Sequence, residues 1–204
     1  MAKLLYQGHG SYRLTMADGR VIYIDPFAGT GYDLPADLIL ITHEHYDHTR
    51  LNLVPVKPDT LVVRESDMMQ NGKYLEKEWD GFKVRAVPAY NENHDRDACV
   101  GYVMTLDGVT VYGSGDTSKT DYMVDVLSKE DIDYALFCMD GVYNMGAEEA
   151  SECARIVGAR HSIPVHMLPA DCGKIFDRKV AETFKAEGRL ILEPGEEIEL
   201  IHED

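Results

Sequence analysis

Four residues whose side chains bind metal ions lie close together in the sequence. His43, His45, Asp47 and His48 follow the apolar run 38–41 after a single threonine. By chance, this order of residues at these offsets is expected in about one in a thousand sequences of this composition. Imidazole and carboxylate groups are ligands for divalent transition metals. The segment therefore predicts a metal site, and the alternative is a loop that carries three solvated histidines.

The spacing of these four residues predicts two metal ions rather than one. At the end of a strand, side chains two positions apart point to the same side, so His43 and His45 can converge on one ion. Where the backbone then curls into a turn, Asp47 and His48 can reach a second ion about 3.5–4 Å from the first. Six residues cannot saturate two metals, so further ligands must come from later loops at the same edge.

The hydrophobic pattern predicts the elements that would position these residues. Short strands separated by turns dominate the first half, and we expect them at 4–6, 12–15, 21–25, 38–42, 61–64, 82–87, 100–106 and 109–112. Asp-Gly pairs at 18–19, 80–81 and 107–108 mark turns between strands. The second half alternates, with strands at 134–139, 161–166, 190–192 and 198–201 and helices at 121–127, at 147–157 and from Asp177 to Gly188.

This order of elements predicts the fold class. Strands come first and strand-helix alternation follows, and no low-complexity linker or internal repeat divides the chain. We expect a single domain over residues 1–204 of the α/β class, in which two sheets pack together and helices cover their outer faces.

Composition and charge exclude several classes of function. Asp and Glu number 36 against 20 Lys and Arg, a net charge of −16, and such a chain repels phosphate backbones. No apolar run approaches the roughly 18 residues that span a bilayer, and the first ten residues lack a secretory pattern. We therefore expect a cytoplasmic protein without nucleic-acid or membrane partners. The four cysteines lack a C-x-x-C pairing, which predicts buried reduced thiols.

The motif His-x-His-x-Asp-His after an apolar strand resembles the signature of the metallo-β-lactamase fold superfamily. Further segments are similar to that family's motifs in the same order: 8–11, 21–26, 88–91 with His94, 113–117, 163–166 and 193–195. The opening and the closing segments look like the branch that contains ascorbate-6-phosphate lactonase. The resemblance covers nearly the whole chain and implies a four-layer αββα sandwich.

The resemblance also implies a ligand set for two divalent metal ions. It assigns His43, His45 and His94 to the first metal, Asp47, His48 and His166 to the second, and Asp116 to a bridging position between them. All of these ligands are nitrogen or oxygen donors, which suit zinc and equally admit manganese or iron.

Three of these assignments have alternatives that the sequence leaves open. His94 lies in a polar segment whose length departs from the family's usual spacing, so a solvated loop, or Asp95 or Asp97 as a substitute ligand, remains open. His166 competes with His161 for the ligand role and could instead be a satisfied core histidine. For Asp116 the alternative is a turn acid that follows a glycine.

Three further residues have candidate roles near the metals. Asp25 is expected to hold a ligand histidine by a hydrogen bond. His9 could line the pocket or pack in the core. Asp140, at the end of a predicted strand, could contact substrate or cap a turn.

The resemblance implies a binuclear metal-dependent hydrolase. Two cations lower the pKa of a shared water so that hydroxide can attack a carbonyl or a phosphorus, while Asp47 ligates the second metal and orients the nucleophile. His45 argues against the diiron branch, which carries a carboxylate there, and Asp116 argues against β-lactam hydrolysis. A small-molecule lactone, ester or phosphoester remains as substrate. Three other functions remain open: a metal-binding sensor without turnover, a nucleic-acid phosphodiesterase and a metal-free structural protein. A homo-oligomer also remains open.

Overall fold

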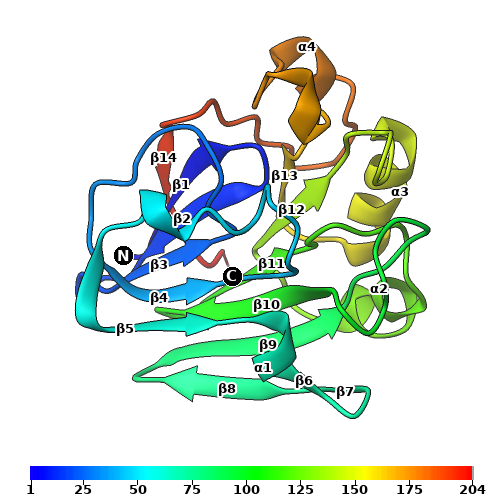
Figure 1. The fold of residues 1–204 in the computed structure, drawn as a ribbon. Coiled ribbons are helices and arrows are strands. Elements are labelled where there is room, and N and C mark those ends of the chain that lie inside the picture. The colour runs from blue at the N-terminus through cyan, green and yellow to red at the C-terminus, as the bar shows by residue number, and fades with distance from the viewer. Residues whose placement is uncertain (204) are drawn as a thin grey trace.

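Two six-stranded mixed sheets form the centre of the computed structural model, which describes residues 1–203 (Figure 1). The first sheet has the order β14-β1-β2-β3-β4-β5. Its strands are β1 (Lys3–Gly8), β2 (Ser11–Thr15), β3 (Val21–Ile24), β4 (Ala36–Leu40), β5 (Val56–Val63) and β14 (Glu197–Glu199). The second sheet has the order β13-β12-β11-β10-β9-β8. Its strands are β8 (Glu76–Trp79), β9 (Phe82–Pro88), β10 (Val100–Leu106), β11 (Val109–Gly113), β12 (Tyr134–Cys138) and β13 (His161–Val165).

The helices are short apart from one. They are α1 (Glu65–Met68), α2 (Asp121–Asp125), α3 (Ala147–Val157) and α4 (Arg178–Ala181), with 3-10 turns η1 (Leu51–Leu53), η2 (Leu127–Lys129) and η3 (Ala170–Cys172). A two-stranded hairpin, β6 (Met69–Gln70) and β7 (Lys73–Tyr74), lies beside α1. Among residues 1–203, no helix has the length and apolar character that crossing a membrane requires.

The main core lies between the two sheets because each sheet turns one apolar face inward. Tyr6 and Ile22 of the first sheet belong to the same buried cluster as Val84 and Tyr102 of the second. Side chains alternate along a strand, so the neighbouring residues face outward and need separate cover.

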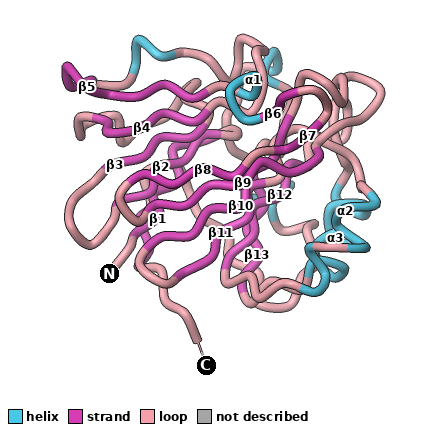
Figure 2. The backbone as a smooth tube through the Cα atoms, turned by 90° about the horizontal axis from the view of Figure 1, so that it is seen from below, coloured by secondary structure: helices cyan, strands magenta, loops and turns pink. Residues whose placement is uncertain are grey.

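The outer cover differs between the sheets. Helices α2, α3 and α4 contribute to a second buried cluster against β11 and β12, which includes Phe137, Cys153 and Phe184, and Figure 2 shows α2 and α3 side by side. On the first sheet, Tyr32 and Leu51 pack on a smaller cluster around Tyr23 and Ile39. The predicted αββα sandwich is confirmed, but a loop and one 3-10 turn form the outer layer of the first sheet.

Several sequence predictions hold in detail. Helix α3 begins and ends where the periodicity predicts, and Gly158 after it adopts a left-handed φ of 67°. The Asp-Gly turn at 80–81 has φ values of 46° and 87°, and that at 107–108 has 49° and 82°. Both turns close antiparallel hairpins, β8 with β9 and β10 with β11.

The C-terminal part departs from the predictions. The helix expected from Asp177 to Gly188 stops at Ala181, although Asp177 does cap it by accepting the N–H groups of Lys179 and Val180. Beyond it, Arg189 donates to the carbonyls of Glu182 and Phe184, so side-chain bonds replace helical ones. The strand expected at 190–192 is reduced to one bridge between Ser162 and Arg189. Sequence periodicity also missed β8, which is rich in charged residues.

The topology brings the carboxyl ends of eight strands to one edge. Strands β3, β4 and β5 are parallel, as are β11, β12 and β13. Strand β1 is antiparallel to β2, and β2 to β3, so β1 runs with β3; by the same argument β9 runs with β11. Residues that are remote in sequence meet at this edge because each follows the end of one of these strands. They are His9, Asp25, His43, Tyr90, Asp116, Asp140 and His166.

Candidate metal centre

Three histidines form the first group of potential ligands. Donor nitrogens of His43, His45 and His94 all lie within 4.8 Å of one another. Their ring centroids are 4.5, 4.9 and 5.0 Å apart. His43 and His94 are buried, whereas His45 is exposed to the cavity above. The structure thus brings together the three histidines predicted for the first metal.

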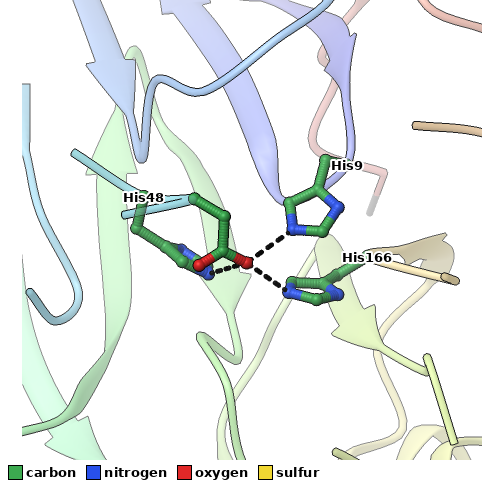
Figure 3. A group of neighbouring side chains, drawn as sticks. His9, His48 and His166 are labelled. Carbon is green, nitrogen blue, oxygen red and sulfur yellow. Dashed lines mark hydrogen bonds and ion pairs between the residues drawn. The ribbon is translucent and has the colours of Figure 1, made fainter. Parts of the chain in front are cut away.

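A carboxylate and three imidazoles form the second group. Asp47 Oδ2 lies 2.9 Å from His9 Nε2, 3.4 Å from His166 Nε2 and 3.6 Å from His48 Nε2. Figure 3 shows the three rings converging on this oxygen from different segments. The residues predicted for the second metal are therefore together, with His9 as an additional member.

Asp116 lies between the two groups. Its Oδ2 is 3.3 Å from His94 Nε2 in the first group, and 3.5 and 3.2 Å from the Nε2 atoms of His48 and His166 in the second. Asn144 donates an amide N–H to the same oxygen over 2.8 Å. This is the place expected of a bridging ligand, and Asp116 is buried at the floor of a cavity rather than a surface turn acid.

Asp25 and Thr42 orient two of the rings. The Oδ2 atom of Asp25 lies 2.9 Å from His48 Nδ1 and accepts the Thr42 hydroxyl over 2.6 Å. Because that hydroxyl proton is given to Asp25, the Thr42 oxygen accepts from His43 Nδ1, 3.0 Å away. With Nδ1 held in this way, each ring directs its Nε2 to the interior, which is the nitrogen that a metal-binding histidine offers once that atom carries no proton. The hydrogen bond predicted for Asp25 is present.

The third ring of this kind is His94. Asn91 Oδ1 lies 2.9 Å from His94 Nδ1, so the Nε2 atom is again directed inward. Asp95 and Asp97 are exposed, and the Asp97 backbone N–H donates to Asp95 Oδ1 in a turn. The geometry therefore favours His94 over either aspartate and over a solvated loop.

His166 and Asp140 meet at the end of β13. His166 is buried, whereas its competitor His161 stacks on Tyr134 away from both groups. Asp140 Oδ1 accepts the backbone N–H groups of Val142 and Tyr143, which caps a turn. Its other oxygen lies 3.4 Å from His166 Nδ1, so Asp140 serves the turn and also faces the site.

Unpaired buried atoms test whether these residues fit a metal. The Nε2 atoms of His43, His48 and His166 are buried and have no hydrogen-bond partner among the described residues. Such orphaned groups cost about 1–3 kcal/mol each in an ordinary interior. Three of them beside two carboxylates, all nitrogen and oxygen donors, fit divalent cations.

Burial and mutual charge shift the titration of the group. Burial, the largest effect, acts to lower the pKa of His166, but the carboxylates of Asp116 and Asp47 outweigh it and raise the pKa to about 9. Burial acts to raise the pKa of Asp116, but His166 and His48 hold it well below the ordinary value. Burial lowers the pKa of His43, which stays neutral. Without a cation, protons on the imidazoles balance the two acids.

The backbone at the site is strained in three places. His9, Asp25 and His166 have φ values of 56°, 46° and 43°, in the left-handed region that non-glycine residues seldom adopt. Gly113-Ser114-Gly115 has a steric explanation, since a Cβ on Gly113 would lie 2.2 Å from the Tyr12 hydroxyl oxygen and Gly115 has a φ of 60°.

Sequence reasoning missed three supporting residues. Thr42, Asn91 and Asn144 each form a hydrogen bond with a potential ligand. Of the three, only Asn91 lies in a segment that resembles a family motif. Asn144 lies 28 positions from Asp116, and no local pattern connects the two. Of the four cysteines, Cys99, Cys138 and Cys153 are buried free thiols as predicted, but Cys172 is exposed.

A cavity of about 680 Å³ opens above the two groups. Its floor includes His45, Asp47, His94, Asp116 and His166, and its wall is formed by Glu44, Tyr46, Asn93, Tyr143, Ala170 and Asp171. A small molecule in this cavity would meet potential ligands of both groups.

Comparison with known proteins gives the family. A model described as "Beta-lactamase superfamily domain" matches residues 3–166. The chain is 33% identical to a "UPF0173 metal-dependent hydrolase" of Thermococcus onnurineus, over 98% of this chain and 100% of the relative. It is 30% identical to a protein of the same description from Natranaerobius thermophilus, over 97% and 99%.

Solved structures agree on the fold. A crystal structure from Parabacteroides distasonis is similar with a TM-score of 0.72 and 29% identity, covering 92% of this chain and 90% of that one. Igni18, a metallo hydrolase from Ignicoccus hospitalis, has a TM-score of 0.71 over 97% of both chains at 22% identity, which concerns the fold alone. Since the family model covers most of the chain and the curated relatives span its length, this protein belongs to the metallo-β-lactamase superfamily and, within it, to the family of the UPF0173 metal-dependent hydrolases.

Proposed function

We propose that this protein is a binuclear metal-dependent hydrolase of a small-molecule lactone, ester or phosphoester. The observation that carries the proposal is the pair of ligand groups joined by Asp116, in which three buried Nε2 atoms form no hydrogen bond among the described residues. The descriptions of the curated relatives support metal-dependent hydrolysis in general.

The two groups would hold one divalent ion each, zinc by preference, with manganese or iron as alternatives. His43, His45 and His94 would bind the first ion, Asp47, His48 and His166 the second, and Asp116 both. When bound, such ions lower the pKa of water to near neutrality and polarise the oxygen of the bond under attack.

The chain's own residues would orient the reactants. Asp47 lies on the cavity floor, where its carboxylate can orient the attacking water by accepting a hydrogen bond. Asn144 donates to Asp116 and to Asp140, which fixes both carboxylates against the wall. Asp25, Thr42 and Asn91 hold the rings in one tautomer, so little reorganisation accompanies the reaction.

We also propose a cytoplasmic location, which the three buried free thiols support because such thiols are typical of reducing compartments. A chain of net charge −16 favours a small-molecule substrate over a nucleic acid.

Metal analysis combined with activity tests the proposal. The protein is stripped with a chelator, reloaded with zinc and assayed on an aryl ester, a lactone and a bis-aryl phosphodiester. We expect two ions per chain and turnover of at least one substrate. Asp116→Ala should lower the metal content with the fold intact by circular dichroism, whereas the exposed acid variant Asp59→Ala should not. Two bound ions with no turnover of any substrate would favour a metal-binding sensor.

A further inference from the structure

The charged side chains in the cavity wall are acidic, which would be unusual in an enzyme that binds anionic substrates. Outside the potential ligands, its charged side chains are Glu44 and Asp171, and the described lining contains neither lysine nor arginine. Glu44 is already paired with Arg64. Asp171 is exposed and forms no ion pair among the described residues. The wall therefore presents negative charge to an incoming molecule.

Two tyrosines provide the apolar part of the same wall. Tyr46 and Tyr143 are 62% and 44% exposed, which is high for aromatic residues that line a cavity. Both side chains line the same cavity as Asp171. Aromatic faces beside a carboxylate are the surroundings that bind flat or cationic groups.

These observations narrow the substrate class. We infer that the substrate is an uncharged or cationic ester or lactone, whose non-reacting part carries a flat apolar or quaternary-ammonium group that contacts Tyr46 and Tyr143. An anionic group in that position would face Asp171 without a cationic partner. Sites that recognise phosphate or carboxylate outside a metal centre commonly supply arginine or lysine for it. This inference rests on the proposed function, since it concerns the same cavity.

A matched substrate series tests the inference. Three p-nitrophenyl esters share the leaving group and differ in the acyl end, which is uncharged, trimethylammonium or carboxylate. We expect kcat/KM of the zinc-loaded protein to be at least tenfold lower for the anionic ester than for the other two. Asp171→Lys should lower kcat/KM for the cationic ester and raise it for the anionic one. Asp59→Lys, the same charge change at an exposed position outside the cavity lining, should leave the order unchanged.

A binding measurement separates this inference from the proposed hydrolysis. Benzyltrimethylammonium is titrated by calorimetry into the zinc-loaded protein and both variants. We expect at least fivefold weaker binding to Asp171→Lys and unchanged binding to Asp59→Lys. If the cation binds in this way but no ester is hydrolysed, the proposed function fails and the cavity assignment stands. If esters are hydrolysed with no preference against the anionic one, the cavity assignment is overturned and hydrolysis stands.

A separate observation concerns His9, which the sequence left between packing and pocket lining. Its Nε2 is 2.9 Å from Asp47 Oδ2, and because a carboxylate only accepts, the nitrogen donates. The side chain is 1% exposed, and its Nδ1 has no partner among the described residues. The ring lies in a group whose other members are potential ligands.

Ring geometry indicates that His9 supports the second group rather than binding its ion. Imidazoles that share one ion at Zn–N distances of about 2.0–2.1 Å keep their ring centroids roughly 4.5–5.5 Å apart. The first group has separations of 4.5 to 5.0 Å, and His48 and His166 are 5.5 Å apart. His9 lies only 3.7 Å from His166 and is tilted over it. Ring centres this close would force the two Nε2 atoms to an angle at a shared ion well below the tetrahedral angle that zinc prefers.

The backbone fixes His9 in this position. Its N–H donates to Ile175 O over 2.8 Å, and its carbonyl accepts the His166 N–H over 2.7 Å and the Tyr6 hydroxyl over 3.0 Å. The geometry points to His9 as a positioning residue that donates to Asp47 and fixes this carboxylate for the second metal. The strained φ of 56° is held by these three bonds.

A pair of similarly sized substitutions tests the role of His9. His9→Gln keeps an N–H donor, and His9→Leu removes it at the same backbone strain. Zinc affinity is measured in competition with a chromophoric chelator, which resolves the two ions. We expect His9→Leu to weaken the second ion about tenfold or more with the first unchanged, and His9→Gln to restore most of this loss.

Three results would overturn the role of His9. Two ions bound to His9→Leu as tightly as to the unaltered protein would show that the donor is dispensable. Equal loss of both ions would indicate general damage to the fold, and equal weakening in Leu and Gln variants would make His9 itself a ligand. If His9→Leu fails to fold, His9→Phe, which retains an aromatic ring beside Phe27 and His166, takes its place in the same comparison.

Discussion

Asp25 accepts three hydrogen bonds from the segment that carries the potential ligands. It accepts the Thr42 N–H over 2.8 Å, the Thr42 hydroxyl, and the His48 Nδ1 proton, all from a backbone with φ of 46°. Asparagine tolerates that φ well, so replacing the carboxylate by an amide removes charge and acceptor capacity with little backbone change.

Asp25→Asn should therefore weaken binding of the second ion by about 10- to 100-fold, because His48 loses its anionic partner. The chelator competition titration measures this. Asp18→Asn, at an exposed turn, is the matched control. Unchanged affinity in Asp25→Asn would show that the hydrogen bond to His48 does not support the metal.

Protons and metal ions should compete at His166. With a pKa of about 9 in the metal-free protein, the ring is protonated at pH 7, and a raised pKa keeps His48 protonated as well. Metal binding requires neutral rings, so affinity should fall as pH falls, and binding at pH 7 should release protons. Calorimetry in two buffers of different ionisation enthalpy measures the release; heats that do not depend on the buffer would contradict it.

The sequence signalled some residues of the site and could not signal others. His43, His45, Asp47 and His48 stand together, so their spacing alone indicated a metal site. The position of His9 depends on how the turn after β1 packs against the end of β13, a long-range contact that no local pattern encodes. Family resemblance rather than periodicity indicated His94 and His166.

Among the elements, the segment after α4 shows where periodicity fails. The pattern through Val180, Ala181 and Phe184 fits a helix, yet the helix ends after one turn because Phe184 inserts into the cluster behind the second sheet. A Cβ on Gly188 would lie 1.8 Å from the Arg160 carbonyl oxygen, so the chain also approaches its neighbour too closely for a regular helix end. Tertiary packing decided the local structure here.

Phe184→Ala should destabilise the protein by about 3–5 kcal/mol, because the fully buried ring packs beside Phe137 and its loss leaves a cavity. Urea denaturation of the zinc-loaded protein measures the loss. Val124→Ala, at an exposed position of α2, should change stability by less than about 0.5 kcal/mol. A similar small effect for Phe184→Ala would mean that the segment is not anchored by this ring.

At the level of the whole molecule, the two sheets gather ligands from strands that are far apart in sequence. The ligand set runs from His43 to His166, so both halves of the sandwich must fold before either ion has a complete site. Ion binding should therefore be coupled to global stability rather than to one loop.

Zinc should raise the melting temperature in a concentration-dependent way. A ligand that binds only the folded chain adds about 2.7 kcal/mol when its free concentration is 100 times its Kd. Differential scanning calorimetry across a zinc series checks this, and Asp116→Ala should flatten the dependence. If the melting temperature of the unaltered protein does not depend on zinc, metal binding is not coupled to folding and the prediction is wrong.

Anomalous diffraction at the zinc absorption edge, from crystals of the zinc-loaded protein, tests the central claim most directly. The account predicts two peaks per chain, one among His43, His45 and His94 and the other among Asp47, His48 and His166, with Asp116 between them. A single peak, or zinc bound only elsewhere on the surface, would contradict it.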